Sequence, residues 1–196
     1  ETLFLTVNLI DRFLEVQTVE RSKLQLVGVT ALLVASKYEE IYPPELRDLV
    51  YITDKAYSQQ EILAMEETIL KALEYNVTIA STHCFLVRYL KAAHADRKLV
   101  WLACYILERT LQEYHMLKYL PSTVASSAIY LARKNLQRSP WSPTLVKYTQ
   151  NTESSLRACL EDISQILSAK LNLTAVKKKY SSTKFGVVAS MTLEGI

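Results

Sequence analysis

The sequence predicts an all-α protein built from two similar helical bundles in tandem. Of the 196 residues, 49% are hydrophobic and only three are glycine, a composition that suits packed helices better than a sheet with many turns. Apolar residues recur at helical spacing along most of the chain. A helix rich in small residues also occurs once in each half, which indicates an internal repeat.

The first predicted helix covers residues 1–15 and carries two apolar stripes. These stripes are Leu3, Val7, Ile10 and Leu14, and Leu5, Leu9 and Phe13. Because the helix is apolar around much of its circumference, we expect it to be buried on two sides. The helical spacing of apolar residues begins at the first residues of the chain. We therefore expect this chain to be a fragment whose first helix has lost neighbours.

Three more helices are expected in the first half. They cover residues 22–40, 44–51 and 58–73, with Ser22 as a candidate N-cap and Ser58 opening a capping box with Glu61. Pro43 and Pro44 stop the first of them. That helix contains small residues whose size would let neighbouring helices approach closely: Gly28, Ala31 and Ala35.

The second half repeats this order, with helices expected over residues 82–93, 98–113, 121–136 and 152–169. The third of these carries small residues 97 positions after those of the first half: Ala125, Ala128 and Ala132. We therefore place one bundle in residues 1–78, a second in 79–170 and a tail of strand or coil in 171–196. The lysines at 177–179 are expected to lie in a solvated, frayed tail; the alternative is a phosphate-binding patch.

No catalytic or metal site is predicted. The three histidines are isolated, and the sequence has neither a glycine-rich phosphate loop nor a nucleophile elbow, so no cofactor is expected either, although a small helical enzyme stays as an alternative. The cysteines, Cys84, Cys104 and Cys159, lack metal-site spacing and predict free thiols in a reducing compartment. The apolar runs are too short to span a bilayer, so no membrane partner is expected.

Two charged residues lie on apolar helix stripes. Lys37 has Leu33, Val34 and Ile41 three and four positions away, and Glu66 has an equivalent apolar setting. A charge in such a place is costly if it is buried and unpaired. Either the Lys37 side chain extends to water and Glu66 lies at the edge of its stripe, or both charges border an apolar groove and await polar groups of a partner.

Several stretches of the chain resemble the cyclin box of A- and B-type cyclins. They are residues 1–14, 23–28, 35–45, 51–54 and 65–66, which include IDRFL, KLQLVG, ASKYEEIYPPE, YITD and ME. The resemblance continues through Phe85-Leu86 and Pro121-Ser122, which look like the second cyclin fold. Residues 178–185, KKYSSTKF, look more like the tail of B-type than of A-type cyclins. The fold implied is two tandem cyclin folds, the first without its opening helix.

This resemblance implies a regulatory subunit that binds and activates a cyclin-dependent protein kinase at the G2/M stage, and is not itself an enzyme. The family's lysine and glutamate that hydrogen-bond the kinase main chain match Lys37 and Glu66. The apolar pocket for the regulatory helix of the kinase matches Val34, Tyr38, Leu70, Tyr75 and Val77. Such a protein is expected in the nucleus and cytoplasm.

Further residues match other family positions. Leu24 and Gln25 resemble part of the hydrophobic patch that docks Arg-x-Leu motifs of substrates and inhibitors, and the rest of that patch belongs to the opening helix. Asp11 matches an acidic residue that pairs with an arginine of the same helix, and we expect Asp11 and Leu26 to be structural. The alternative is a DNA-binding module of the cyclin-fold transcription-factor type, but a net charge of +3 with interspersed acids argues against nucleic acid as a partner.

Overall fold

The computed structural model describes residues 1–169 and 173–195, and within them all regular structure is helical. This confirms the predicted all-α class. The chain forms two compact units, Glu1–Ile79 (unit 1) and Ala80–Ile196 (unit 2). Among the described residues, no helix has both the length and the apolar character needed to cross a membrane.

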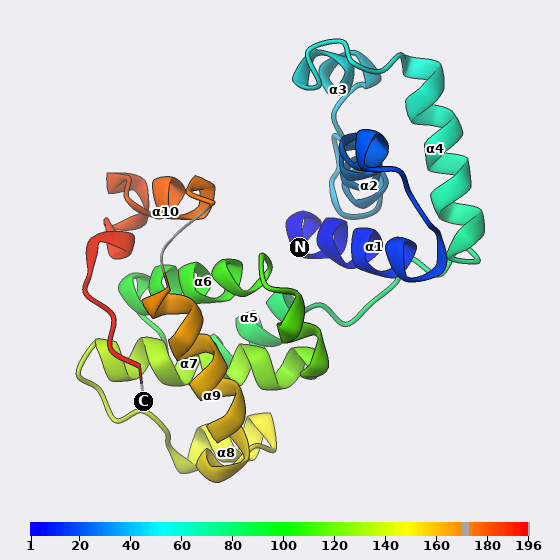
Figure 1. Ribbon diagram of the computed structural model, residues 1–196. Helices are drawn as coiled ribbons and strands as arrows, with labels where there is room; N and C mark the ends of the chain where they lie inside the picture. Colours follow the sequence, from blue (N-terminus) through cyan, green and yellow to red (C-terminus); the bar gives the residue numbers. More distant parts are fainter. Residues whose placement is uncertain (170–172, 196) are drawn as a thin grey trace. The chain divides into compact units, whose positions relative to one another are not determined.

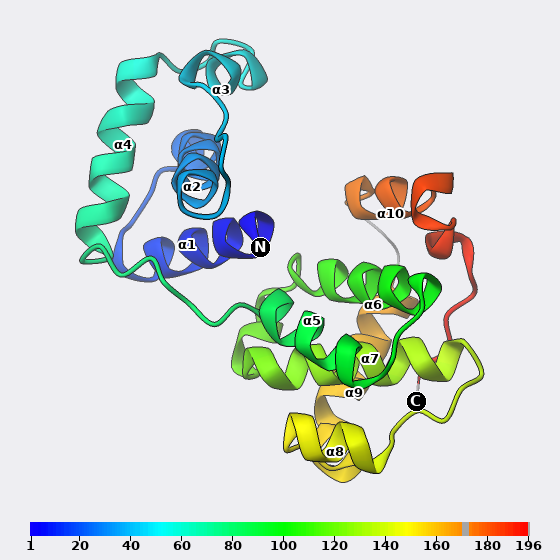
Figure 2. The same cartoon turned by 180° about the vertical axis from the view of Figure 1, so that it is seen from behind.

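Unit 1 is arranged around one central helix. Its helices are α1 (Thr2–Val16), α2 (Leu24–Glu39), α3 (Leu46–Ile52) and α4 (Gln59–Ala72), with a short 3-10 helix, Arg21–Lys23, before α2. Figures 1 and 2, seen from opposite directions, show α1, α3 and α4 on three sides of α2. Helices α1 and α4 both pack on α2, which matches the expected role of a small-residue helix wrapped by neighbours.

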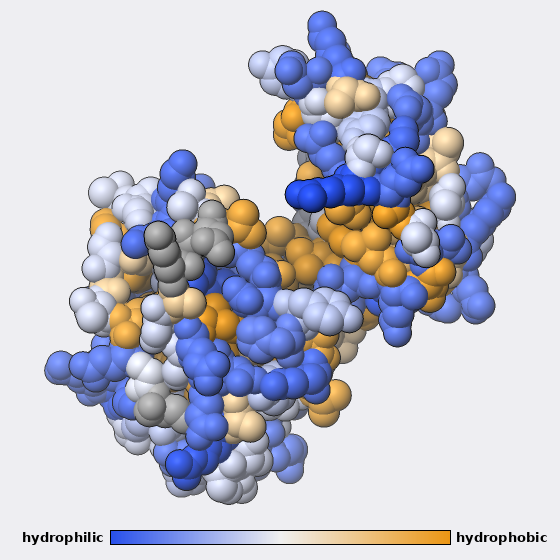
Figure 3. Space-filling view, in the orientation of Figure 1, coloured by the Kyte–Doolittle hydropathy of each residue, from blue (hydrophilic) through white to orange (hydrophobic). Residues whose placement is uncertain are grey.

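The core of unit 1 buries only one of the two stripes of α1. Leu5, Leu9 and Phe13 are buried against α2 and α4. In the other stripe, Leu3 and Leu14 are 44% and 38% exposed, and Figure 3 shows apolar side chains gathered over α1. In the same outer stripe Ile10 is partly buried against the core. The outer stripe is therefore only partly covered, which is the exposure expected of a helix that lacks neighbours on one side.

The starts of the helices follow from their capping groups. At α4 the predicted capping box is confirmed: the Ser58 hydroxyl accepts from the Glu61 amide at 3.2 Å, and the Glu61 carboxylate accepts from the Ser58 amide at 2.9 Å. The predicted N-cap of α2 is wrong. Ser22 lies in the preceding 3-10 helix and its hydroxyl donates to the Glu20 carboxylate, so α2 begins at Leu24.

Gly28 does not serve the purpose predicted for it. A Cβ atom built at this position would meet no atom within 4 Å, so no neighbouring helix approaches closely there. Ala31 and Ala35, by contrast, are fully buried in the core. The close packing around α2 therefore depends on the alanines, and the glycine leaves a helix position without a side chain.

Unit 2 repeats the arrangement around α7. Its helices are α5 (Thr82–Ala92), α6 (Arg97–Thr110), α7 (Pro121–Asn135), α8 (Pro143–Thr149), α9 (Glu153–Ser168) and α10 (Ala175–Tyr180). Helices α5, α6 and α9 all pack on α7, whose alanines Ala125, Ala128 and Ala132 are fully buried. The predicted helix 98–113 ends earlier, at Thr110, and a 3-10 helix, Tyr114–Lys118, follows it.

The predicted coil-like, frayed tail is wrong. Residues 170–172 and 196 lie outside the described part of the chain, but α10 and two 3-10 helices, Thr183–Phe185 and Val188–Ser190, follow. Helix α10 and Val188–Ser190 pack on α6, and Thr183–Phe185 packs on α10. The buried Glu108 carboxylate on α6 accepts from Lys179 Nζ and from the Tyr180 hydroxyl, both at 2.6 Å. The tail is therefore held by a buried carboxylate, and Lys179 is not a free tail charge.

Candidate partner-binding site

Lys37 and Glu66 meet at the surface of unit 1. Lys37 lies in the last turn of α2 and Glu66 in the middle of α4. The Lys37 Nζ atom lies 2.7 Å and 2.8 Å from the two carboxylate oxygens of Glu66. The Lys37 side chain is 47% exposed and that of Glu66 only 14%. The sequence pattern singled out the two residues separately, and the structure shows that they form an ion pair.

The local sequence explains this position. Helix α2 ends at Glu39, where Glu40 turns into an extended conformation, and Pro43 and Pro44 prevent any return to a helix. Lys37 therefore stands at the open end of a helix whose preceding turns are buried. Lys37 is also the basic residue of the last turn of α2, where a positive charge is favoured.

The ion pair retains unused hydrogen-bonding capacity. An ammonium group has three donors, and each carboxylate oxygen can accept more than one hydrogen bond. The Lys37 side chain is half-exposed, so water can replace part of its bond to Glu66 and the ammonium group can turn toward a partner. The pair can therefore offer a donor and an acceptor to the main chain of a partner at one place.

The five predicted pocket residues lie at different depths in unit 1. Tyr38 is half-exposed, and its hydroxyl lies 2.6 Å from the Thr78 hydroxyl. Tyr75 is exposed, with a left-handed backbone (φ 58°), in the turn after α4. Leu70 and Val77 are partly buried against the core, whereas Val34 is part of that core. Tyr38 and Tyr75 are thus the members most open to a partner, and the contact role of the set stays a prediction.

The structure also exposes apolar residues that the sequence pattern did not single out as site residues. Ile41 and Tyr42 are 88% and 89% exposed in the loop after α2, and Tyr51 and Ile52 are exposed at the end of α3. Large apolar side chains that gather on a surface are typical of interaction sites. Part of the signal was present in the sequence, because Pro43 and Pro44 stop the predicted helix at residue 40, before Ile41 and Tyr42.

The remaining predicted residues divide between surface and core. Leu24, the first residue of α2, and Gln25 are both exposed. Leu26 is buried in the second core cluster of unit 1, with Leu33 and Ile62 among its neighbours. Asp11 is partly buried, and this burial raises the pKa of its carboxyl above the ordinary value.

The cysteines and the acidic residues do not form a reactive centre in the described part of the chain. No group of three or more His, Cys, Asp or Glu side chains there could hold a metal ion. All three cysteines are free, and only Cys84 is exposed among them. Burial raises the pKa values of Cys104 and Cys159 to about 11, so both of these thiols are protonated at neutral pH.

Comparison with known proteins identifies the family of the chain. The family model described as "Cyclin, N-terminal domain" matches residues 1–78, and "Cyclin, C-terminal domain" matches residues 80–194. A viral cyclin from herpesvirus saimiri has a similar structure, with a TM-score of 0.73 and 19% identity, covering 84% of this chain and 76% of that chain. This likeness concerns the fold of the two tandem helical domains.

Curated relatives are more similar in sequence. "G2/mitotic-specific cyclin-B" of Arbacia punctulata is 49% identical over 94% of this chain, and "Cyclin-B1-3" of Arabidopsis thaliana is 48% identical over 96% of it. The chain spans 47% and 46% of the lengths of these two relatives. Their names agree with the B-type resemblance predicted from the tail. With both domain models matched, the chain belongs to the cyclin family.

Proposed function

We propose that this chain binds a cyclin-dependent protein kinase and activates it as a regulatory subunit in the control of cell division. The observation that carries the proposal is the Lys37–Glu66 pair with the exposed aromatic residues Tyr38, Tyr42 and Tyr75 on the same small unit. Membership of the cyclin family and the B-type relatives support it. We propose that the protein acts in the nucleus and cytoplasm.

The mechanism follows from binding energetics. An amphipathic helix of the kinase packs its apolar side on the surface around Tyr38 and Tyr75, while Lys37 and Glu66 hydrogen-bond main-chain groups at its edge. If this chain binds the active position of that helix more tightly than the inactive one, binding shifts the kinase population toward the active state. The kinase supplies the catalytic groups and the Mg²⁺ and ATP sites.

The test compares two double variants on a purified cyclin-dependent kinase. K37A/E66A removes the proposed contacts, and E67A/K71A removes a second Lys–Glu ion pair from α4 that is exposed on both sides. Both variants leave the net charge unchanged. We expect K37A/E66A to lose about 2–5 kcal/mol of binding free energy, and E67A/K71A to activate the kinase like the parent. Equal activation by all three proteins would refute the proposed interface.

A second surface of unit 1 is proposed for substrate docking. Leu24 and Gln25 are exposed at the start of α2, and Lys37 lies more than three helical turns further along the same helix. This separation allows a segment with an Arg-x-Leu motif to contact Leu24 and Gln25 while the kinase occupies the other end of α2. Asp11 and Leu26 lie deeper and have structural roles in this proposal.

A further inference from the structure

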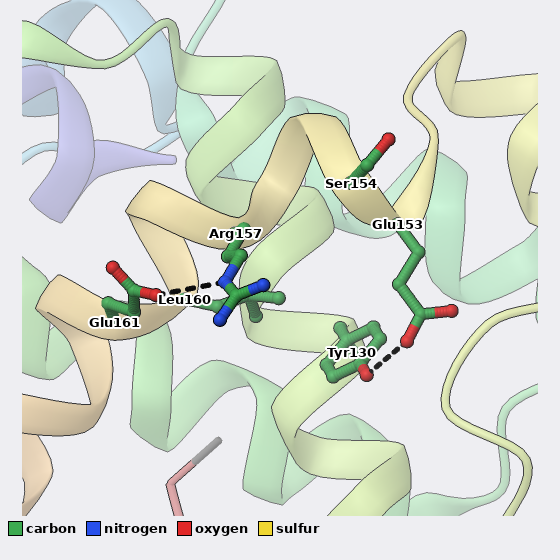
Figure 4. A pocket seen from close by; sticks show the side chains of 6 residues that line it. All are labelled: Tyr130, Glu153, Ser154, Arg157, Leu160 and Glu161. Carbon is green, nitrogen blue, oxygen red and sulfur yellow. Dashed lines mark hydrogen bonds and ion pairs between the residues drawn. The ribbon is translucent and has the colours of Figure 1, made fainter.

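A cavity of about 470 Å³ lies on the surface of unit 2, which contains none of the residues assigned above. It lies where α7 and α9 meet and is lined by six residues: Tyr130, Glu153, Ser154, Arg157, Leu160 and Glu161 (Figure 4). This volume is large enough for more than one side chain of a peptide. Its lining combines an apolar inner wall with charged groups at the rim.

The inner wall is formed by buried and fixed groups. Leu160 and Tyr130 are both buried, and the Tyr130 ring contacts the Trp141 ring at a centroid distance of 6.2 Å. The Tyr130 hydroxyl donates to the Glu153 carboxylate at 2.5 Å. This hydrogen bond, with the burial of the phenol, raises the pKa of Tyr130 to about 12. The wall is therefore preformed, and the Tyr130 hydroxyl has no second proton to donate to a ligand because its one proton is bonded to Glu153.

The rim carries acidic groups at its two ends. Glu153 and Glu161 are eight residues apart on α9, so the helix rise separates their backbone positions by about 12 Å. Only one oxygen of Glu153 is used by Tyr130. Between them, Arg157 donates to Glu161 at 3.1 Å, but this pair is exposed, with side chains 79% and 50% accessible. Such a pair is weak, so Glu161 can exchange its partner.

We propose that this cavity binds an extended segment of a partner protein that has basic residues at its first and fifth positions and a large apolar residue at its third. In an extended chain every second side chain faces the same way, and the first and fifth lie about 13 Å apart. That spacing matches the separation of Glu153 and Glu161. The third side chain then reaches the wall formed by Leu160 and Tyr130.

The charges of the rim favour a basic occupant over an acidic one. Two carboxylates and one guanidinium leave an excess negative charge. The N-terminus of α9 attracts anions, but the Glu153 carboxylate already occupies its first turn. When the segment binds, its fifth residue replaces Arg157 at Glu161, and the Arg157 side chain turns to solvent. Arg157 is therefore a competitor for the site, and its removal is expected to strengthen binding.

The test uses a fluorescently labelled peptide, Gly-Arg-Ala-Leu-Ala-Arg-Gly, titrated with the full chain and followed by anisotropy. A peptide of the same composition with the two arginines adjacent is the spacing control, and one with glutamates in place of the arginines is the charge control. We expect the spaced arginine peptide to bind more tightly than both controls, and its affinity to fall as salt is added. Equal affinities, preference for the acidic peptide or no binding of the spaced peptide would overturn the proposal.

Single substitutions then locate the site. E161Q and E153Q are each expected to weaken binding about three- to fivefold, the range of one exposed ion pair, and R157Q to strengthen it. The amide oxygen that E153Q introduces could still accept from Tyr130, and Glu161 is exposed, so both variants should fold; circular dichroism checks this. E113Q, which changes a half-exposed glutamate outside the cavity, should bind like the parent. If R157Q weakened binding, or if E113Q had the same effect as E161Q, the peptide would be bound elsewhere.

Discussion

Replacing Tyr180 by phenylalanine removes one hydroxyl group and leaves the packing of α10 in place. The Tyr180 ring is buried and contacts the rings of Tyr105 and Phe185 at 5.5 Å and 4.9 Å, contacts that a phenylalanine keeps. What is lost is the hydrogen bond to the buried Glu108 carboxylate, which retains Lys179 as a partner. A hydrogen bond to a charged group contributes about 1.5–3 kcal/mol, and we expect unit 2 to lose that much free energy of unfolding.

The tryptophans allow the free energy of unfolding of unit 2 to be measured separately. Both of them, Trp101 and Trp141, lie in unit 2, so tryptophan fluorescence during urea unfolding follows that unit alone. We expect Y180F to lower the urea midpoint without changing the slope. Y114F, which removes the hydroxyl of a tyrosine that is 86% exposed, should match the parent. A loss below about 0.5 kcal/mol, the usual range for surface substitutions, would show that the bond to Glu108 does not hold the tail.

The same hydroxyl gives a dependence on pH. Burial, together with the Glu108 carboxylate, raises the pKa of Tyr180 above its ordinary value. In the unfolded chain the phenol ionises near its ordinary pKa of about 10, whereas the folded protein keeps it protonated. The stabilisation is therefore complete below about pH 10 and declines as the pH rises above it. Y180F should show a shallower decline in stability in this alkaline range than the parent.

Three further variants test other features of the structure. Gly28→Ala should stabilise unit 1 by about 0.5–1 kcal/mol, because a methyl group meets open space in mid-helix, and calorimetry showing a loss would contradict this. Gly186→Ala should destabilise unit 2 by at least about 1–2 kcal/mol from its left-handed backbone (φ 60°) alone, with a Cβ 2.7 Å from the Trp101 ring adding to the loss; an unchanged urea midpoint would count against it. Changing Leu24 and Gln25 to alanine should leave phosphorylation of a simple peptide by the bound kinase intact and weaken phosphorylation of a substrate with an Arg-x-Leu motif. Equal loss of activity on both substrates would argue against a separate docking surface.

The helices themselves were predictable because their signals are local. The spacing of apolar residues predicted α1, α2, α4, α6, α7 and α9. The capping box formed by Ser58 and Glu61 was predicted from four consecutive residues. The repeat of alanines predicted that α7 would be as central to its unit as α2. The start of α2 was missed because the Ser22 hydroxyl bonds to the preceding Glu20 carboxylate and does not cap the helix. The spacing of residues does not show which of these two local bonds Ser22 makes.

The tail could not be predicted from its own residues. The side chains on α6 and α7 that hydrogen-bond the tail lie far from it in the sequence. Glu108 is 71 positions from Lys179, and Asn135 exchanges hydrogen bonds with the Glu194 backbone across 59 positions. A segment with no internal periodicity and three consecutive lysines therefore resembled a solvated end. The Gly28 prediction failed for a related reason, since a small residue indicates close approach only if another element is actually there.

The candidate site was predicted residue by residue through the cyclin resemblance, but its geometry was not. Periodicity placed Lys37 and Glu66 on separate apolar stripes and left open whether either faced water. Their mutual ion pair depends on how α2 and α4 cross, which a single sequence does not specify. The prolines after Ile41 and Tyr42, in contrast, predicted that α2 ends before these two residues, and the structure shows them exposed.

The central claim, that Lys37 and Glu66 contact a kinase, is tested most directly by exchanging their charges. K37E/E66K keeps an ion pair between α2 and α4 and the net charge of the chain, yet it places an acceptor where the partner meets a donor and a donor where it meets an acceptor. Titration calorimetry with a purified cyclin-dependent kinase should show binding weakened by about 2–5 kcal/mol, with the thermal stability of unit 1 retained. Parent-like affinity of the exchanged variant would contradict the claim, because the pair would then serve only to join two helices.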